Sequence, residues 1–253
     1  MMKALIISLT NSYPAQMATR HLMGSIKRTK SKLEPLTIDA TTPMTFQEDL
    51  EKIDEIDARN LQWTWPIEPS QDGMDLNTGL YKRHYTTDDM LKVVACMVSH
   101  MRCWQMCIDL DETVVILEHD AEFTRKFDFD DLKEDFKGGI IGLNHPKNAT
   151  RRAKVFHDKV SQKEGLQPVP SVQESHEDPL PQGLAGNSAY VISPAAAKKL
   201  LNKTKEVGLW PNDAIMCKQL FPWMQVVFPY YTKVQGLKST TTCLLYTSDA
   251  ADE

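Results

Sequence analysis

The chain contains no apolar stretch that approaches the roughly 20 residues needed to span a bilayer. The apolar core of its N-terminus, MMKALIISLT, covers residues 4–9. It is shorter than the core of a secretory signal peptide, and no small-residue cleavage site follows it cleanly. We therefore interpret residues 4–9 as a first strand, expect no transmembrane segment, and predict a cytoplasmic protein.

The chain also has fewer basic than acidic residues. The 29 Lys and Arg residues are outnumbered by 34 Asp and Glu residues, which gives a formal net charge of −5 over 253 residues. This balance argues against a nucleic-acid partner held by charge. With 42% apolar residues, the chain is long enough and apolar enough to bury the core of one globular domain.

Paired cysteine motifs are missing too: the five cysteines include no Cys-x-x-Cys. Cys96, His100, Cys103 and Cys107 form a stripe along one predicted helix. The stripe spans roughly 16 Å at 1.5 Å per residue, so at most two neighbours can share a metal ion whose ligands lie within about 2.3 Å of it. We interpret these cysteines as buried, reduced thiols.

An unbroken aliphatic run, residues 114–117, is followed directly by Glu118, His119 and Asp120. Such a run is typical of a strand buried on both faces of a parallel sheet. Ligands of open α/β sheets bind beyond the carboxyl ends of the strands. Because side chains alternate along a strand, Glu118 and Asp120 share a direction and can hold a hard divalent cation. The alternative is a strand end that runs into a helix cap with solvated charges.

Further short strands alternate with helices, which indicates βαβ units and a mostly parallel central sheet flanked by helices. We expect a single α/β domain over residues 1–242. Residues 243–253 resemble translated sequencing-adapter sequence and are predicted to be a non-native tail. The expected strands include 36–38, 140–143, 190–192 and 226–228, and the expected helices 15–26, 86–109, 130–136 and 195–205.

Two long segments lack clear periodicity. Residues 58–85 carry several aromatic side chains, which can stack on a sugar or base or pin the loop to the core. Residues 145–182 are polar and form either a lid over substrate or an inert insertion.

Four stretches together resemble glycosyltransferase family 25, the group that contains lipooligosaccharide and collagen galactosyltransferases. The first strand and helix match in position. ACMVSHMRCW resembles the family's Gly-Cys-x-x-Ser-His-x-x-x-Trp helix, VVILEHDAEF its Glu-Asp-Asp strand end, and GNSAYVISPAAAKKLL its Gly-x-x-Ala-Tyr-x-Ile-Ser segment. Their order and spacing agree over roughly residues 3–235.

The resemblance implies a GT-A-like fold and a role in lipopolysaccharide biosynthesis. It implies an inverting hexosyltransferase that moves galactose or glucose from a UDP-sugar to a hydroxyl of a saccharide or glycolipid acceptor. The expected cofactor is a divalent metal, with Mn²⁺ favoured, and the metal ligands are Glu118, His119 and Asp120. The expected catalytic residues are Asp120 and Asp213, the latter as general base. The expected substrate-binding residues are Arg20, which can meet a phosphate, His100, Asn187, Ser188 and Tyr190.

The chain departs from the family pattern at two places. The first loop lacks the usual acidic and basic run, and His119 replaces the middle acid of the triplet, which removes one negative charge from the metal site. Two other functions therefore stay open. One is a non-catalytic nucleotide-sugar-binding protein with a degenerate metal site. The other is a metal-dependent hydrolase, although the seven histidines show no His-x-His or His-x-x-x-His.

Overall fold

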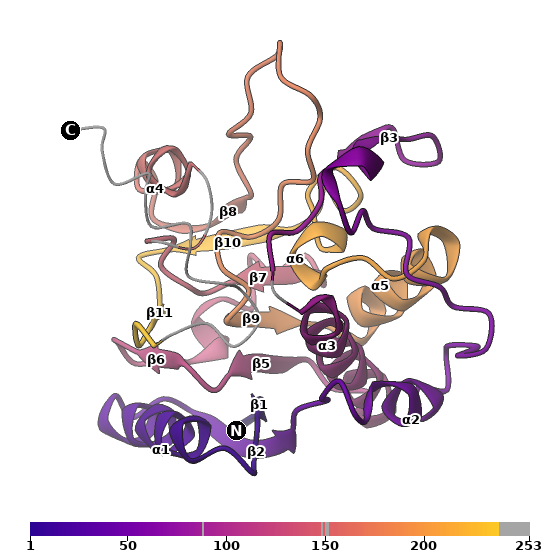
Figure 1. The fold of residues 1–253 in the computed structure, drawn as a ribbon. Coiled ribbons are helices and arrows are strands. Elements are labelled where there is room, and N and C mark those ends of the chain that lie inside the picture. The colour runs from indigo at the N-terminus through magenta and orange to yellow at the C-terminus, as the bar shows by residue number, and fades with distance from the viewer. Residues whose placement is uncertain (88, 148, 150–151, 238–253) are drawn as a thin grey trace.

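A seven-stranded sheet forms the centre of the molecule (Figure 1). We analysed a computed structural model, which describes residues 1–87, 89–147, 149 and 152–237. In spatial order the strands are β2 (Leu33–Asp39), β1 (Met2–Ser8), β5 (Val114–Glu118), β9 (Ala189–Ile192), β7 (Ile140–Gly142), β10 (Gln225–Phe228) and β8 (Gly165–Pro168). β9 and β8 run antiparallel to the other five strands. The predicted mostly parallel α/β sheet is confirmed.

Helices cover both faces of this sheet. They are α1 (Tyr13–Arg28), α2 (Phe46–Glu51), α3 (Met90–Leu110), α4 (Ala153–Val160), α5 (Pro194–Val207) and α6 (Asn212–Ile215). In β5, Val114 and Ile116 belong to the core that α3 and α5 close, whereas Val115 and Leu117 belong to the core that α1 closes. Successive side chains of β5 thus enter two cores on opposite faces of the sheet. This explains why β5 is an unbroken apolar run in the sequence.

Two small sheets flank the central one: β11 (Thr232–Val234) pairs with β6 (Ala121–Phe123), and β3 (Gly73–Asp75) pairs with β4 (Leu80–Lys82). The first of these matters for function, because β6 directly follows the Glu118-His119-Asp120 turn. β11 therefore holds the chain just beyond the carboxyl end of β5.

Several predicted boundaries need correction. The helix expected over residues 130–136 is a single 3-10 turn, Phe129–Asp131, with Asp128 accepting a hydrogen bond at its start. Helix α3 begins after Asp89, whose side chain accepts from the Leu91 amide. Residues 145–182 contain α4 and β8, and the stretch between β8 and β9 projects from the body (Figure 1). The predicted tail, residues 243–253, lies outside the described residues.

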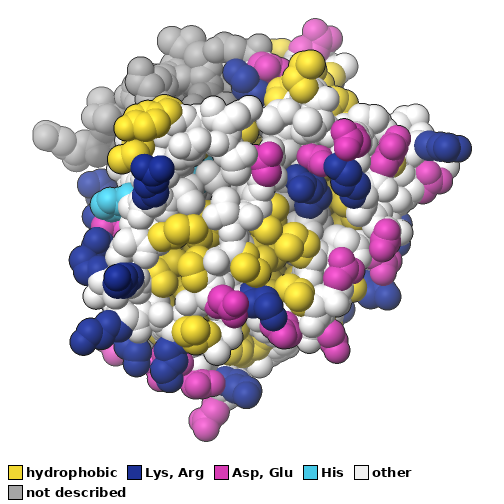
Figure 2. All heavy atoms as spheres, turned by 90° about the horizontal axis from the view of Figure 1, so that it is seen from below, with side chains coloured by type: hydrophobic (Ala, Val, Ile, Leu, Met, Phe, Trp, Pro, Cys, Tyr) yellow, Lys and Arg dark blue, Asp and Glu magenta, His cyan; other side chains and the backbone are white. Residues whose placement is uncertain are grey.

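The face seen from below in Figure 1 is drawn in Figure 2. Hydrophobic side chains gather near its centre, and side chains of both charge signs are interspersed around them. Such mixing is typical of a solvated surface rather than of a phosphate-binding one. Among the residues that the structure describes, no helix combines the length and hydropathy that crossing a bilayer requires.

The connection before β9 passes very close to α6. A Cβ atom at Gly183 would lie 2.4 Å from the Asp213 carbonyl oxygen and 3.3 Å from that of Met216. Both neighbours are backbone atoms, which cannot rotate away. Glycine at position 183 therefore sets the distance between this connection and α6.

We expect Gly183→Ala to lower the free energy of unfolding by about 1–3 kcal/mol, the usual cost of overpacking. Urea denaturation monitored by tryptophan fluorescence measures it. The matched control is Gly24→Ala in α1, where a new Cβ meets nothing within 4 Å and a helical position favours alanine by about 0.5–1 kcal/mol. Equal effects of the two substitutions would contradict the close approach at Gly183.

Candidate active site

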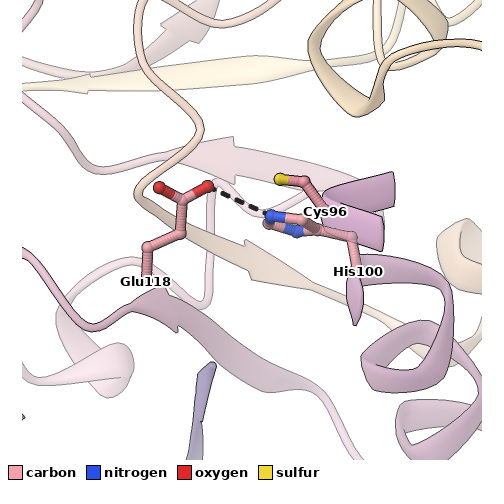
Figure 3. A group of neighbouring side chains, drawn as sticks. All are labelled: Cys96, His100 and Glu118. Carbon is pink, nitrogen blue, oxygen red and sulfur yellow. Dashed lines mark hydrogen bonds and ion pairs between the residues drawn. The ribbon is translucent and has the colours of Figure 1, made fainter. Parts of the chain in front are cut away.

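Glu118 ends β5 and points toward α3, where His100 faces it (Figure 3). The His100 Nε2 atom lies 3.2 Å from Glu118 Oε1, and the Ser188 hydroxyl lies 3.5 Å from the other carboxylate oxygen. Burial acts to raise the pKa of Glu118, but the hydrogen bond and charge of His100 outweigh it and leave that pKa below its usual value. Glu118 is therefore held ionised in a partly buried position.

A chain of hydrogen bonds behind His100 fixes its orientation. Trp104 Nε1, which can only donate, lies 2.9 Å from the Tyr190 hydroxyl oxygen, and that hydroxyl lies 2.9 Å from His100 Nδ1. Because the ionised Glu118 carboxylate can only accept, His100 Nε2 carries a hydrogen and donates it to Glu118. The Tyr190 hydroxyl accepts from Trp104 and forms a further hydrogen bond with His100 Nδ1. All three side chains of this relay are buried.

Asp120 is the second carboxylate at this edge. It is partly buried, and its Oδ1 atom is inaccessible and has no hydrogen-bond partner among the described residues. Burial, followed by the neighbouring charge of Glu118, raises the pKa of Asp120 to about 7. Burying an unpaired carboxylate oxygen costs free energy, so this atom lacks a partner that a cation or substrate would supply.

Asp213, at the start of α6, is exposed to water. Nevertheless, desolvation by the protein around it, together with the charge of Glu118, raises the pKa of this carboxyl. Burial raises the pKa of the nearby Cys96 thiol well above its usual value. The charges of Glu118, Asp213 and Asp120 raise it further. The structure thus brings the three predicted carboxylates into one electrostatic neighbourhood. Their roles in catalysis and metal binding stay predictions.

The predicted substrate-binding residues fall into two groups. Ser188 and Tyr190 contact Glu118 and His100 as described, and Asn187 precedes them. Asn187 is 7% exposed, and neither its amide oxygen nor its amide nitrogen has a partner in the described part of the chain. Arg20 lies on the exposed side of α1, with its guanidinium 3.8 Å from the Met17 sulfur. The structure gives no contact between Arg20 and the carboxylates.

Two ligand sets compete for a metal ion. Cys96, His100 and Glu118 offer atoms that all lie within 4.8 Å of one another, the one such group found in the described residues (Figure 3). However, a metal on His100 Nε2 would displace the hydrogen that this atom donates to Glu118. Burial and the neighbouring acids also raise the pKa of the Cys96 thiol well above its usual value, which disfavours the thiolate that a metal ion would bind.

The oxygen ligands fit a hard cation better. Asp120 has an unsatisfied oxygen, and Glu118 is ionised beside it. Burial lowers the pKa of His119, so its ring is neutral and able to ligate, while its amide donates to the Ile7 carbonyl. Glu118, His119 and Asp120 stay the predicted set on the chemistry of their donor atoms, but among the described residues only the Cys96 group brings three ligand atoms within 4.8 Å of one another.

Sequence reasoning missed one residue that shapes this edge, Gln235. Its side-chain nitrogen donates to the backbone carbonyls of His119 and Ala121, and its backbone N–H donates to the carbonyl of Asp120. Gln235 lies in no motif and far along the chain, so only the pairing of β11 with β6 reveals it.

The family model described as "Glycosyltransferase family 25 (LPS biosynthesis protein)" matches residues 1–216. No curated protein matches the chain. Similar solved structures include mouse xyloside xylosyltransferase 1 in its apo form, with 11% identity, 89% of this chain and 84% of that chain covered, and a TM-score of 0.41. Galactosyltransferase LgtC in complex with donor and acceptor sugar analogs gives 10% identity, coverage of 89% and 73%, and a TM-score of 0.36.

We expect Tyr190→Phe to lower the free energy of unfolding by about 2 kcal/mol, because it leaves buried nitrogens of Trp104 and His100 without a partner. Chemical denaturation measures the change. Tyr13→Phe, at a position 70% exposed, is the control and should change stability by less than about 0.5 kcal/mol. Unchanged stability of Tyr190→Phe would refute the relay.

Asp120→Asn should stabilise the metal-free protein at pH 8. The folded-state pKa of Asp120, about 7, lies above its ordinary value of 3.8, so the folded state binds the extra proton and stability falls as pH rises between these values. Asparagine removes that loss. We expect a higher Tm than wild type at pH 8, with the difference shrinking as pH falls toward 4. A constant difference across this range would contradict the assignment.

Proposed function

The chain belongs to glycosyltransferase family 25 and is a glycosyltransferase; on that premise we propose that it transfers a hexose, galactose or glucose, from a UDP-sugar to an acceptor hydroxyl with inversion. One observation carries the metal-assisted part of the proposal. Asp120, directly after the buried strand β5, keeps a carboxylate oxygen inaccessible and unpartnered beside the ionised Glu118. That arrangement suits a cation and the phosphates it would accompany.

The proposed reaction is a single displacement. The acceptor hydroxyl attacks the anomeric carbon, the bond from that carbon to the diphosphate oxygen breaks, and the hydroxyl proton passes to a carboxylate. Asp213 is proposed as that base, because its raised pKa favours proton uptake and water reaches it. The diphosphate leaves as negative charge grows on it.

A divalent cation held by Asp120 and Glu118, with His119 alongside, would neutralise the charge on the departing diphosphate. Hydrogen bonds within the protein fix the carboxylate at this position. The relay from Trp104 through Tyr190 holds His100, which in turn holds Glu118. Asn187, with both amide atoms free of partners in the described residues, is proposed to bind the donor.

The test is a UDP-release screen over several nucleotide sugars with a saccharide acceptor, run with Mn²⁺ and with chelator. We expect release with a UDP-hexose, stimulation by Mn²⁺, and loss of about 10²–10³-fold in Asp120→Asn. Asp54→Asn, an exposed acid outside the site, is the control and should keep full rate.

Other outcomes separate the competing functions. UDP that raises thermal stability without release from any donor would indicate a non-catalytic binder. Cleavage of phosphoesters without sugar transfer would indicate a hydrolase. Full Mn²⁺-stimulated activity in Asp120→Asn would remove this residue from the mechanism.

A further inference from the structure

A cavity of about 570 Å³ lies beside β11, between the turn that follows β10 and helix α4. His145 and His157 line one part, and Tyr230 and Lys233 line another. Its later lining residues, 228–230 and 232–236, lie beyond the family match to residues 1–216. The cavity is large enough for a saccharide of one or two rings.

Aromatic rings form one wall of this cavity. His145 stacks on His157 with ring centroids 5.1 Å apart, Tyr230 meets His145 edge-on at 5.1 Å, and Phe228 meets Tyr230 at 5.5 Å. The faces of such rings carry partial negative charge and attract C–H groups. A pyranose ring presents a face of C–H groups, so this wall fits a sugar.

Two polar atoms in this wall have no partner among the described residues: the Tyr230 hydroxyl and His157 Nδ1. Tyr230 is 6% exposed, and burial raises its pKa to about 12, so it stays a hydroxyl. A buried hydroxyl without a partner costs free energy unless a ligand or water satisfies it. Neither atom has surface open to solvent, so a ligand in the cavity would satisfy them only with a small shift of the rings.

The charge around the cavity is positive. Lys147 and Lys233 line it, and none of its described lining residues is Asp or Glu. Lys233 lies 3.5 Å from Glu122, but that carboxylate also pairs with Arg28 at 2.9 Å and His21 at 3.3 Å. Glu122 therefore cannot neutralise every cation beside it, and Lys233 keeps charge available for an anionic ligand.

The cavity adjoins the carboxylate edge. Gln235 lines it and holds the carbonyls of His119, Asp120 and Ala121. Val234, also in the lining, pairs with Ala121. A ligand in the cavity would thus sit one strand away from the residues proposed to hold the donor.

We propose that this cavity binds the acceptor, and that the acceptor is an acidic saccharide, whose ring packs on the wall formed by His145, His157 and Tyr230 while its carboxylate or phosphate meets Lys147 and Lys233. The proposal rests on the proposed transfer function. The donor also carries anionic groups, but its diphosphate is assigned to the cation position at Asp120, which leaves the lysines of the cavity for the second substrate.

Direct binding tests the proposal without any turnover. NMR titrations would compare galacturonic acid with galactose, and glucose 6-phosphate with glucose, each with and without saturating UDP. We expect each acidic sugar to bind at least about tenfold more tightly than its uncharged counterpart, with UDP leaving its affinity unchanged. Equal affinity for charged and uncharged sugars would overturn the proposal. Competition between UDP and the acidic sugar would also overturn it, by assigning the cavity to the donor.

Two variants locate the binding. Lys233→Gln should weaken the acidic sugars about tenfold. Lys198→Gln on α5, which loses a similarly exposed lysine with an equal 3.5 Å ion pair to Glu55, should leave their affinity unchanged. Equal effects of the two substitutions would show that general charge, not the cavity, attracts the sugars.

Tyr230→Phe separates a binding role from a structural one. Because the hydroxyl has no partner in the described residues, we expect an unchanged or higher Tm together with weaker binding of the acidic sugars. A lower Tm with unchanged binding would refute its role. If binding follows these expectations but no nucleotide sugar releases UDP, the transfer function fails while the cavity assignment stands.

Discussion

The hydrogen bond between His100 and Glu118 is the interaction on which the site depends. A carboxylate at the end of a strand buried on both faces is costly unless another group compensates it. His100 supplies that compensation from α3, and Tyr190 and Trp104 fix the ring from β9 and α3. The consecutive elements α3 and β5 therefore have to pack against β9, which is distant in sequence, before Glu118 can be ionised there.

The other polar groups at this edge are not compensated by the protein itself. One Asp120 oxygen and both amide atoms of Asn187 lack partners in the described part of the chain. Burial and the charge of Glu118 raise the pKa of Asp120 and of Asp213. The same packing that stabilises Glu118 thus destabilises its neighbours, which is the usual physical signature of a site shaped for a ligand rather than for maximal stability.

The sequence predicted what local patterns encode. The aliphatic run of β5 and the acids that follow it, the strand β9 and the helix α5 after Ser193 all lie near where spacing placed them. The sequence predicted helix starts and short turns less well. The helix expected from residue 86 begins only after its cap, Asp89. The helix expected over residues 130–136 is one 3-10 turn, because a single capping aspartate there begins a turn that no apolar periodicity extends.

Long-range pairing accounts for what local patterns could not show. β6 and β11 are each three residues long, too short for a periodic signal, and they meet only through the tertiary fold. Yet their pairing places Gln235 against the acidic turn and Tyr230 and Lys233 around the adjoining cavity. Because one short ladder positions both the carbonyls behind Asp120 and the wall of the cavity, a displacement of β11 would move the two regions together. The distance between the proposed donor position and the proposed acceptor cavity is therefore set by a strand pair, not by the motif residues on either side of it.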